Sequence, residues 1–251
     1  MASLFDGTKG MENIGDMLSQ MEANIPHPWS TSKRLWQLRR ATDISSHNRS
    51  RETMLEKAVA MLAENEHMPG WFNQCPTASG IGDSSRSRHS NIDLVHWSRA
   101  GIRARLIELK WDSDNPSEAV QQVLRYGAAY LFCRIHRNRL PVRRGSVMYA
   151  CDISLQVAAP AGYYTDSGLR HSLTRARKHL ARFDIGSRID GLSMSLDVLA
   201  FPEWFDGLPF ANGEEVRAEC STAELTEAGR KVRDAFDGLA SVYPEADGGR
   251  P

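Results

Sequence analysis

The stretch Asn91–Trp111 has the sequence Asn-Ile-Asp-Leu-Val-His-Trp-Ser-Arg-Ala-Gly-Ile-Arg-Ala-Arg-Leu-Ile-Glu-Leu-Lys-Trp. Two apolar runs flank Ala100-Gly101, a pattern that predicts a β-hairpin with a two-residue turn at its tip. Folding about this tip sets Asp93 opposite Glu108, because both residues lie equally far from it. Side chains alternate between the faces of a strand, so Glu108 and Lys110 should share one face and the apolar side chains the other. A metal site needs such a gathering of charges, whereas a core does not.

The size and composition of the chain are those of a globular protein that can bury a sizeable core. It has 251 residues, of which 41% are hydrophobic and 25% are charged, and these values are typical of soluble domains. No run of about 18 apolar residues occurs, so no membrane span is expected. The N-terminus has no charged region followed by a hydrophobic one, so secretion is not expected either.

Cysteine and histidine positions bear on the compartment and on metal binding. The four cysteines are scattered and include no Cys-x-x-Cys pair: Cys75, Cys133, Cys151 and Cys220. Scattered cysteines suit a reducing environment, which predicts a cytoplasmic protein without a zinc site. The eight histidines, of which His89 and His96 lie nearest the hairpin carboxylates, show no metal-ligand spacing.

The net charge is zero, with 31 basic and 31 acidic residues, but the charge is unevenly distributed. Residues 99–190 carry sixteen Lys/Arg against eight Asp/Glu, and residues 201–251 carry five against eleven. A basic middle permits a surface that binds polyanions without making the whole protein basic. The alternative is a solvated surface, which most charged runs form. Charge alone leaves both interpretations open.

Hydrophobic periodicity and capping residues predict the order of elements. One helix should begin after Ser50 as its N-cap, and another after Asn115, with Pro116 at the first helical position. The expected helices are 31–42, 50–66, 115–132, 166–183 and 222–239. The expected strands are 71–78, the two arms of the hairpin, 146–159 and 192–201.

This order predicts an α/β protein with a mixed central β-sheet flanked by helices. An αβββαβ core should be followed by a C-terminal α-β-α extension. Residues 1–45 are expected to form a loosely packed N-terminal arm with a short basic helix, and residues 46–205 the core. Residues 206–251 should form an acidic C-terminal helix and tail packed on the same domain.

The hairpin and the next helix resemble the PD-(D/E)XK nuclease superfamily. Its members have an αβββαβ core, an acidic residue on the second strand and Glu/Asp-x-Lys on the third, which Asp93 and Glu108-Leu109-Lys110 match. A RecB-like branch adds Gln-x-x-x-Tyr on the following helix, which Gln122-Val-Leu-Arg-Tyr126 matches. Many members also carry a glutamate on the first helix, and Glu56 is the best counterpart. The resemblance covers residues 50–160 and implies a restriction-endonuclease-like fold.

The resemblance implies a Mg²⁺-dependent nuclease in which Mn²⁺ can substitute. The implied ion ligands are Asp93, Glu108, the carbonyl of Leu109, and Glu56. Carboxylate and carbonyl oxygens are the ligands that Mg²⁺ prefers. Lys110 would orient the attacking water or stabilise charge in the transition state. Gln122 and Tyr126 would position the metal site and the nucleic-acid backbone.

Several residues have competing interpretations. The superfamily's name has proline where this chain has Ile92, at a position that varies among members. Glu56 lies nearly opposite the apolar stripe of its helix, and Glu52 lies somewhat closer to it. Asp83 could replace Asp93, but it stands in a polar loop with no strand pattern. Gln122 and Tyr126 could also be a plain polar helix edge.

Glu-x-Lys by itself also describes an ion pair on a solvated strand. The chain has 25 arginines but only six lysines, and yet it uses lysine at position 110. Arginine is a permanently charged fork, whereas lysine is a compact charge whose pKa can shift. The choice of Lys110 therefore favours a chemical role.

The expected partner is nucleic acid, with DNA as the first candidate, although the sequence leaves DNA or RNA open. The candidate phosphate contacts are Arg86, Arg88, Arg137, Arg143 and Arg144. One alternative is a catalytically inert nuclease-like domain that binds nucleic acid or a partner protein. Another is an interaction protein whose acidic C-terminal segment is the active surface. No membrane partner is expected, and a homodimer is compatible with the sequence.

Overall fold

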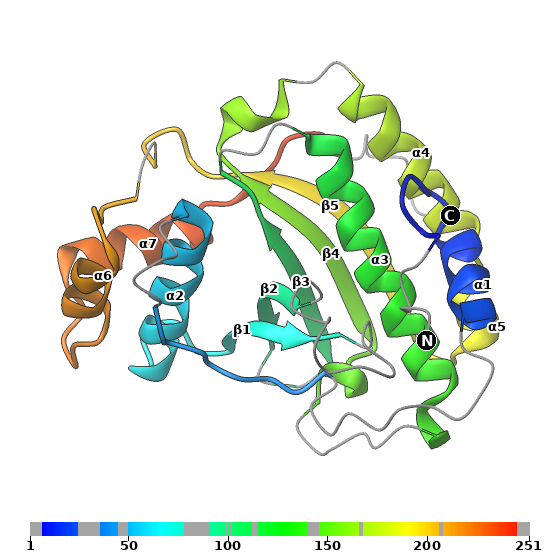
Figure 1. Ribbon diagram of the computed structural model, residues 1–251, viewed down its shortest axis with the longest axis horizontal. Helices are drawn as coiled ribbons and strands as arrows, with labels where there is room; N and C mark the ends of the chain where they lie inside the picture. Colours follow the sequence, from blue (N-terminus) through cyan, green and yellow to red (C-terminus); the bar gives the residue numbers. More distant parts are fainter. Residues whose placement is uncertain are drawn as a thin grey trace.

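The structure is a computed structural model that describes residues 7–24, 36–44, 50–77, 91–98, 100, 102–111, 115–139, 146–165, 168–205 and 208–244. Figure 1 shows a twisted sheet between two layers of helices. Helices α1, α3 and α4 lie on one side of the sheet, and helices α2, α6 and α7 lie on the other. This arrangement confirms the expected α/β class with a mixed central sheet.

The six described strands lie side by side in chain order: β1 Trp71–Pro76, β2 Asn91–Trp97, β3 Arg103–Leu109, β4 Asp152–Ala159, β5 Ser193–Ala200 and β6 Ala240–Ser241. Strands β1, β2 and β3 are antiparallel neighbours. Strands β3, β4 and β5 run parallel, and β6 is antiparallel to β5. The C-terminal ends of the parallel strands β3, β4 and β5 therefore lie together at the same end of the sheet.

The described α-helices are α1 Ile14–Asn24, α2 Arg51–Glu64, α3 Pro116–Ile135, α4 Leu169–Arg182, α5 Ile185–Arg188, α6 Gly213–Cys220 and α7 Glu227–Asp237. Short 3-10 helices are η2 Arg137–Arg139, η3 Val147–Tyr149 and η4 Ala161–Tyr164. The order from α2 to β4 is αβββαβ, as expected. None of the helices in the described ranges combines the length and the apolar character that crossing a membrane requires.

The two predicted N-caps are confirmed. The Ser50 side chain accepts a hydrogen bond from the Thr53 N–H and starts α2. The Asn115 side chain accepts one from the Glu118 N–H and starts α3, with Pro116 in its first turn. These caps fix where both helices begin, at the edge of the sheet where β3 ends.

The predicted hairpin register is confirmed, because Leu94 pairs with Ile107 in antiparallel β2 and β3. Ile107 and Leu109 take the face opposite Glu108, as predicted, but the face that carries Glu108 is apolar as well and is not a charged face. Leu106 packs in the core on the α3 side, while Ile107 packs in the core on the α2 side. A strand with a parallel neighbour is covered by helices on both faces, so Glu108 lies at the end of an otherwise apolar row.

The N-terminal region is not the expected loose arm. Four apolar side chains of α1 are buried against the core on the α3 side: Ile14, Met17, Leu18 and Met21. Their spacing is that of an amphipathic helix, so the signal was present in the sequence. The expected basic helix at 31–42 is absent from residues 36–44, and residues 31–35 lie outside the described ranges.

Residues 36–44 instead run beside β1. The Trp36 N–H donates to the Pro76 carbonyl, and the Asn73 N–H donates to the Arg39 carbonyl. Asn73 also binds Ala41 through its side-chain amide, which accepts from the Ala41 N–H at 2.6 Å. This segment is therefore tied to the outer strand of the sheet.

Two further boundaries differ from the prediction. Strand β4 begins at Asp152, because Val147–Tyr149 form a 3-10 turn that Ser146 caps. The helix expected at 222–239 is present as α7 but begins later, after Thr226 as its N-cap, and α6 precedes it as a helix that was not predicted. Both helices lie beside α2 in Figure 1.

Arg177 on α4 covers the edge of β5 that β6 leaves free. Strand β6 pairs only with Leu199 and Ala200. Further along β5, the Arg177 guanidinium donates to the Leu196 carbonyl at 2.9 Å and to the Asp197 carboxylate at 2.6 Å. The side chain is therefore committed to the sheet and does not form part of an open basic surface.

Candidate active site

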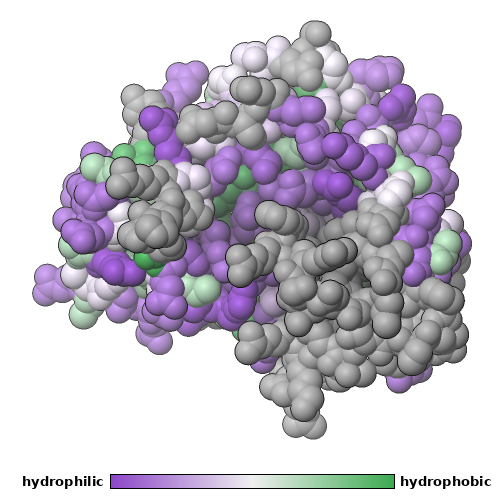
Figure 2. Space-filling model, in the orientation of Figure 1, coloured by the Kyte–Doolittle hydropathy of each residue, from purple (hydrophilic) through white to green (hydrophobic). Residues whose placement is uncertain are grey.

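The predicted site residues meet where β3 ends. Asp93 comes from β2, and Glu108 and Lys110 come from the end of β3 and the residue after it. Gln122 and Tyr126 come from the N-terminal half of α3, which lies beside these strand residues. In Figure 2 the surface between α2 and α3 is mostly hydrophilic, with a small hydrophobic area within it.

Glu108 is a buried carboxylate held at both oxygens, with 2% of the residue exposed. Its Oε1 accepts from Lys110 Nζ at 2.7 Å, and its Oε2 accepts from the Tyr126 hydroxyl at 2.9 Å. Burial raises the pKa of Glu108, and the Lys110 charge opposes this shift. The carboxylate is thus oriented by one cation and one neutral donor.

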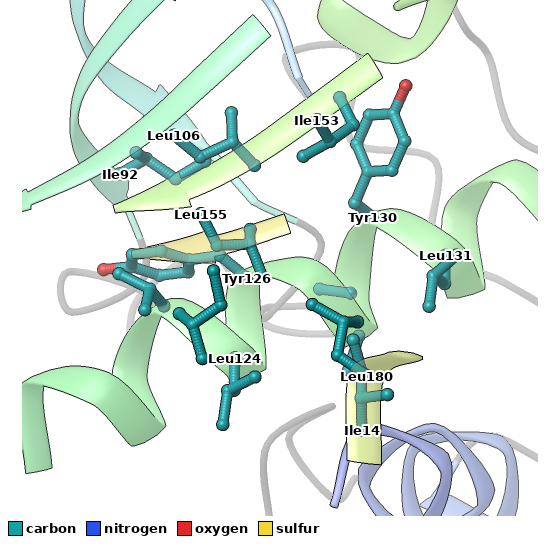
Figure 3. Close-up of a cluster of buried hydrophobic side chains, with 14 of the residues drawn as sticks. Ile14, Ile92, Leu106, Leu124, Tyr126, Tyr130, Leu131, Ile153, Leu155 and Leu180 are labelled. Atoms are coloured by element: carbon teal, nitrogen blue, oxygen red, sulfur yellow. The ribbon is translucent and has the colours of Figure 1, made fainter. Parts of the chain in front are cut away.

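Tyr126 links the helix to the strand. Its ring packs among apolar side chains such as Leu124 and Leu155, while its hydroxyl points out of this cluster (Figure 3). Gln122 Nε2 donates to the hydroxyl oxygen at 2.8 Å. Burial, followed by the Glu108 charge, raises the pKa of Tyr126 well above its usual value. The hydroxyl therefore stays protonated and can donate to Glu108.

Asp93 is the second carboxylate of the site. Its Oδ2 accepts from the backbone N–H of Leu109 at 2.9 Å. Burial raises the pKa of Asp93 well above its usual value, and the negative charges of Glu108 and then Glu56 raise it further. The charge of Glu108 therefore disfavours ionisation of Asp93, and carboxylates perturbed by burial together with a like charge occur preferentially at functional sites.

Lys110 is the cation among these carboxylates. Burial acts to lower its pKa, but the negative charges of Glu108 and Asp93 outweigh burial and raise it. The Lys110 side chain is 19% exposed and the Glu108 side chain 3%, so Lys110 is the more exposed of the two. The Lys110 N–H donates to the Ala158 carbonyl of β4, which fixes the backbone while the side chain keeps its own freedom.

Two glutamates of α2 face the site from the opposite side. Glu52 Oε1 accepts from the Trp111 N–H at 2.9 Å, and its charge acts on Glu108 and Lys110. From the sequence, Glu56 was the best counterpart of the glutamate that the resembled family carries on its first helix. The structure brings both Glu52 and Glu56 near the strand carboxylates. The signal for Glu52 was its position closer to the apolar stripe of the helix.

Glu56 is buried and already has partners. Its Oε1 accepts from the Asn73 amide at 2.7 Å and lies 3.6 Å from Lys57 Nζ. Burial raises the pKa of Glu56, while Lys57 opposes the shift. Gln74, whose amide lies 3.5 Å from Glu56 Oε2, has the left-handed φ of 48° that non-glycine residues rarely adopt. Glu56 is thus tied to β1 while its charge still acts on Asp93.

The expected phosphate contacts are largely untested. Four of them lie outside the described residues: Arg86, Arg88, Arg143 and Arg144. Arg137 is exposed just beyond the C-terminal end of α3. From Tyr126 the helix continues for about 13.5 Å to Ile135, at about 1.5 Å per residue, and Arg137 lies beyond this end. Arg137 therefore does not adjoin the carboxylates.

The fit of this site to a metal ion depends on few ligands. Within the described ranges, no three or more His, Cys, Asp or Glu side chains are arranged to hold a metal ion. Two carboxylates and a strand-end backbone carbonyl, at Asp93, Glu108 and Leu109, remain as hard oxygen donors. Mg²⁺ is usually held by one or two carboxylates together with waters and substrate phosphate. The donor set therefore fits Mg²⁺ in that mode and does not fit an ion enclosed by protein ligands alone.

Comparison of the chain with protein-family models, with curated proteins and with solved structures found no match.

Proposed function

We propose that this protein is a metal-dependent nuclease that hydrolyses phosphodiester bonds of nucleic acid, with DNA as the first substrate to test. The observation that carries the proposal is the pairing of Asp93 with Glu108 beside Lys110. Burial raises the pKa of both carboxylates, and the charge of Glu108 raises that of Asp93 further, so holding both negative charges here is costly unless a cation is brought to them. The resemblance of these residues to the PD-(D/E)XK pattern supplies the class of reaction.

Some residues of the site would bind the metal ion, and others would position the ligands of that ion. Asp93 and Glu108 would hold Mg²⁺, or Mn²⁺ in its place, with the Leu109 carbonyl. The bound ion would neutralise charge on the scissile phosphate and lower the pKa of a water molecule. Tyr126 fixes Glu108 by its hydrogen bond, and Gln122 in turn fixes the tyrosine hydroxyl. We expect this support to preserve the angle at which Glu108 faces the substrate.

Lys110 is the candidate for stabilising the reaction itself. Its ammonium can orient the attacking water or interact with the charge that develops on the phosphate. Glu52 supplies a further negative charge near Lys110, which helps to keep the ammonium protonated. The nucleic acid would approach from the side on which Lys110 is open to solvent.

A second candidate function is binding of nucleic acid or a partner protein without cleavage. It is favoured by the internal bonding of the site, since both Glu108 oxygens and one Asp93 oxygen already have protein donors. The cytoplasm, expected from the cysteine spacing, remains the proposed compartment for either function.

The test is incubation of purified protein with linear, circular and single-stranded DNA and with RNA. Each substrate is combined with Mg²⁺, Mn²⁺, Ca²⁺ or EDTA, and a Glu108→Gln protein purified in parallel controls for contaminating nucleases. Cleavage by the wild type that needs Mg²⁺ or Mn²⁺ and is missing from the variant would support the nuclease. Metal-independent binding without cleavage of any substrate would favour the second candidate.

A further inference from the structure

Four different donors engage the carboxylate oxygens of Asp93, Glu108 and Glu52. Two of these donors are backbone N–H groups, of Leu109 to Asp93 and of Trp111 to Glu52. The third is the Tyr126 hydroxyl, and the fourth is the ammonium of Lys110, both on Glu108. The other oxygen of Asp93 is not bound by these donors, whereas a divalent ion that binds Glu108 competes with the donor already on each of its oxygens.

The four donors differ in their freedom to move. Leu109 ends β3, which pairs with β4, and Trp111 follows Lys110, whose N–H is bonded to β4. The Tyr126 ring is buried in the core, with only 2% of the residue exposed. Lys110 instead has a flexible four-carbon stem and a side chain that is 19% exposed. It is therefore the donor that can withdraw without disturbing the sheet or the core.

Lys110 also supplies the charge that the site requires. Its Nζ lies 2.7 Å from Glu108 Oε1, and Asp93 and Glu52, on β2 and α2, act on it as well. Carboxylates from three elements thus share one ammonium. Unit charges a few ångströms apart in a partly buried site interact strongly, so a bound divalent ion and this ammonium would repel each other at the same carboxylates.

We propose that Lys110 is an internal counter-cation that a divalent ion displaces from Glu108, so that Lys110 weakens metal binding while it stabilises the metal-free protein. This inference rests on the proposed function, since it concerns the same site. Displacement frees Glu108 Oε1 for the ion and releases the ammonium toward the open side of the site. The lysine then becomes available to the substrate only when the ion is bound.

The test is the affinity of the wild type, Lys110→Met and Lys110→Arg for Ca²⁺, measured by titration calorimetry at pH 8. Methionine keeps the length of the side chain and removes its charge. We expect Lys110→Met to bind Ca²⁺ at least about tenfold more tightly than the wild type. Lys110→Arg should stay within about threefold of the wild type because it keeps the charge. Lys231→Met, which removes an exposed lysine of α7, is the matched control and should not differ from the wild type.

Thermal stability gives a second readout that does not depend on cleavage. In EDTA, Lys110→Met should melt below the wild type, because its carboxylates lose their cation. In Ca²⁺ its melting temperature should rise by more than that of the wild type, since tighter binding stabilises the folded state more. A variant that fails to fold would be recognised here, and Lys110→Gln then replaces it in the titration.

The possible outcomes separate this inference from the proposed function. Equal or weaker Ca²⁺ binding by a folded Lys110→Met protein overturns the inference, even if the wild type cleaves nucleic acid. Tighter binding by Lys110→Met supports it, even if the wild type cleaves no substrate and the nuclease proposal fails. Absence of divalent binding in both proteins overturns both.

Discussion

The hydroxyl oxygen of Tyr126 lies 2.9 Å from Oε2 of Glu108, so a residue in the middle of α3 fixes the carboxylate at the end of β3. The bond is buried, and Gln122 supports it from one turn earlier on the same helix. A buried hydrogen bond to a charged group contributes more than one between neutral groups. Helix α3 therefore sets the orientation of Glu108 as well as covering the sheet.

Glu108→Gln should abolish cleavage and leave the fold intact. Glutamine has the same size and can still bond with Tyr126, but it lacks the charge that would hold Mg²⁺ in the proposed nuclease. We expect the cleavage rate to fall at least about 100-fold, the scale for losing one essential group. Circular dichroism checks the fold, and Glu214→Gln on the exposed surface of α6 is the control. Full activity in the variant would exclude Glu108 from the site.

Lys110→Arg should separate binding from catalysis. The guanidinium keeps the positive charge, so nucleic-acid and Mg²⁺ binding should stay within a few-fold of the wild type. It is bulkier and permanently protonated, so it cannot position a water as lysine does. Single-turnover cleavage at saturating protein should fall by about two orders of magnitude. Cleavage at the wild-type rate would reduce Lys110 to a counter-ion.

Binding to nucleic acid should weaken steeply as salt increases. The outer side of α4 carries exposed Arg170, Lys178 and Arg182, whereas Arg177 on the same helix is bound to β5. Removing all three charges should lower the slope of log affinity against log salt by about 2–3 units for duplex DNA. Anisotropy titrations between low and moderate salt measure the slope, and Lys231→Ala on α7 is the control. An unchanged slope would remove α4 from the binding surface.

Asp93→Asn should stabilise the protein at neutral pH and not at acidic pH. The pKa of Asp93 is raised in the folded state, so the folded protein binds the proton more tightly than the unfolded chain does. Stability contributed in this way is present below the usual aspartate pKa of about 3.9 and is lost as pH rises through the folded value. Asparagine removes the titration and still accepts from Leu109.

We therefore expect calorimetry in EDTA to show a melting temperature about 2–4 °C or more above the wild type at pH 8. The difference should shrink toward zero near pH 4. A variant that is less stable than the wild type at pH 8 would show that the Asp93 charge stabilises the fold.

Leu18→Ala should destabilise the whole protein, because α1 is part of the core and is not an arm. Leu18 is 1% exposed, and replacing a buried leucine by alanine costs about 2–5 kcal/mol. Urea unfolding measures the loss, and the neighbouring exposed Ser19→Ala should change stability by less than about 0.5 kcal/mol. Equal stabilities of the Leu18→Ala and Ser19→Ala proteins would contradict this prediction and would show that α1 is a loosely packed arm.

The features predicted well from the sequence depend on local chemistry. The hairpin register follows from the equal distances of Asp93 and Glu108 from the turn, and the caps at Ser50 and Asn115 follow from hydrogen bonding within one turn. Each of these signals is complete within a short stretch. Tertiary packing did not need to be known.

The features predicted poorly depend on what packs against what. The alternation of side chains along β3 does not reveal that helices cover both of its faces. It therefore predicted one face that carries charged side chains only. Glu52 and Glu56 lie one turn apart on α2, and only the position of the strands shows which carboxylate each one meets. The same holds for α1, whose apolar side becomes meaningful once α3 is seen beside it.

The outer strands of the sheet have a consequence for how copies of this protein can associate. Main-chain groups of β1 are occupied by residues 36–44, and Arg177 binds the Leu196 carbonyl on β5. The unpaired main-chain groups of an edge strand can pair with a strand of another chain and so extend the sheet, which is a common route to aggregation. At these positions of β1 and β5 the main-chain groups are already bonded, so a strand of another copy cannot pair with them. A homodimer of this protein would therefore form without extending the sheet at these positions.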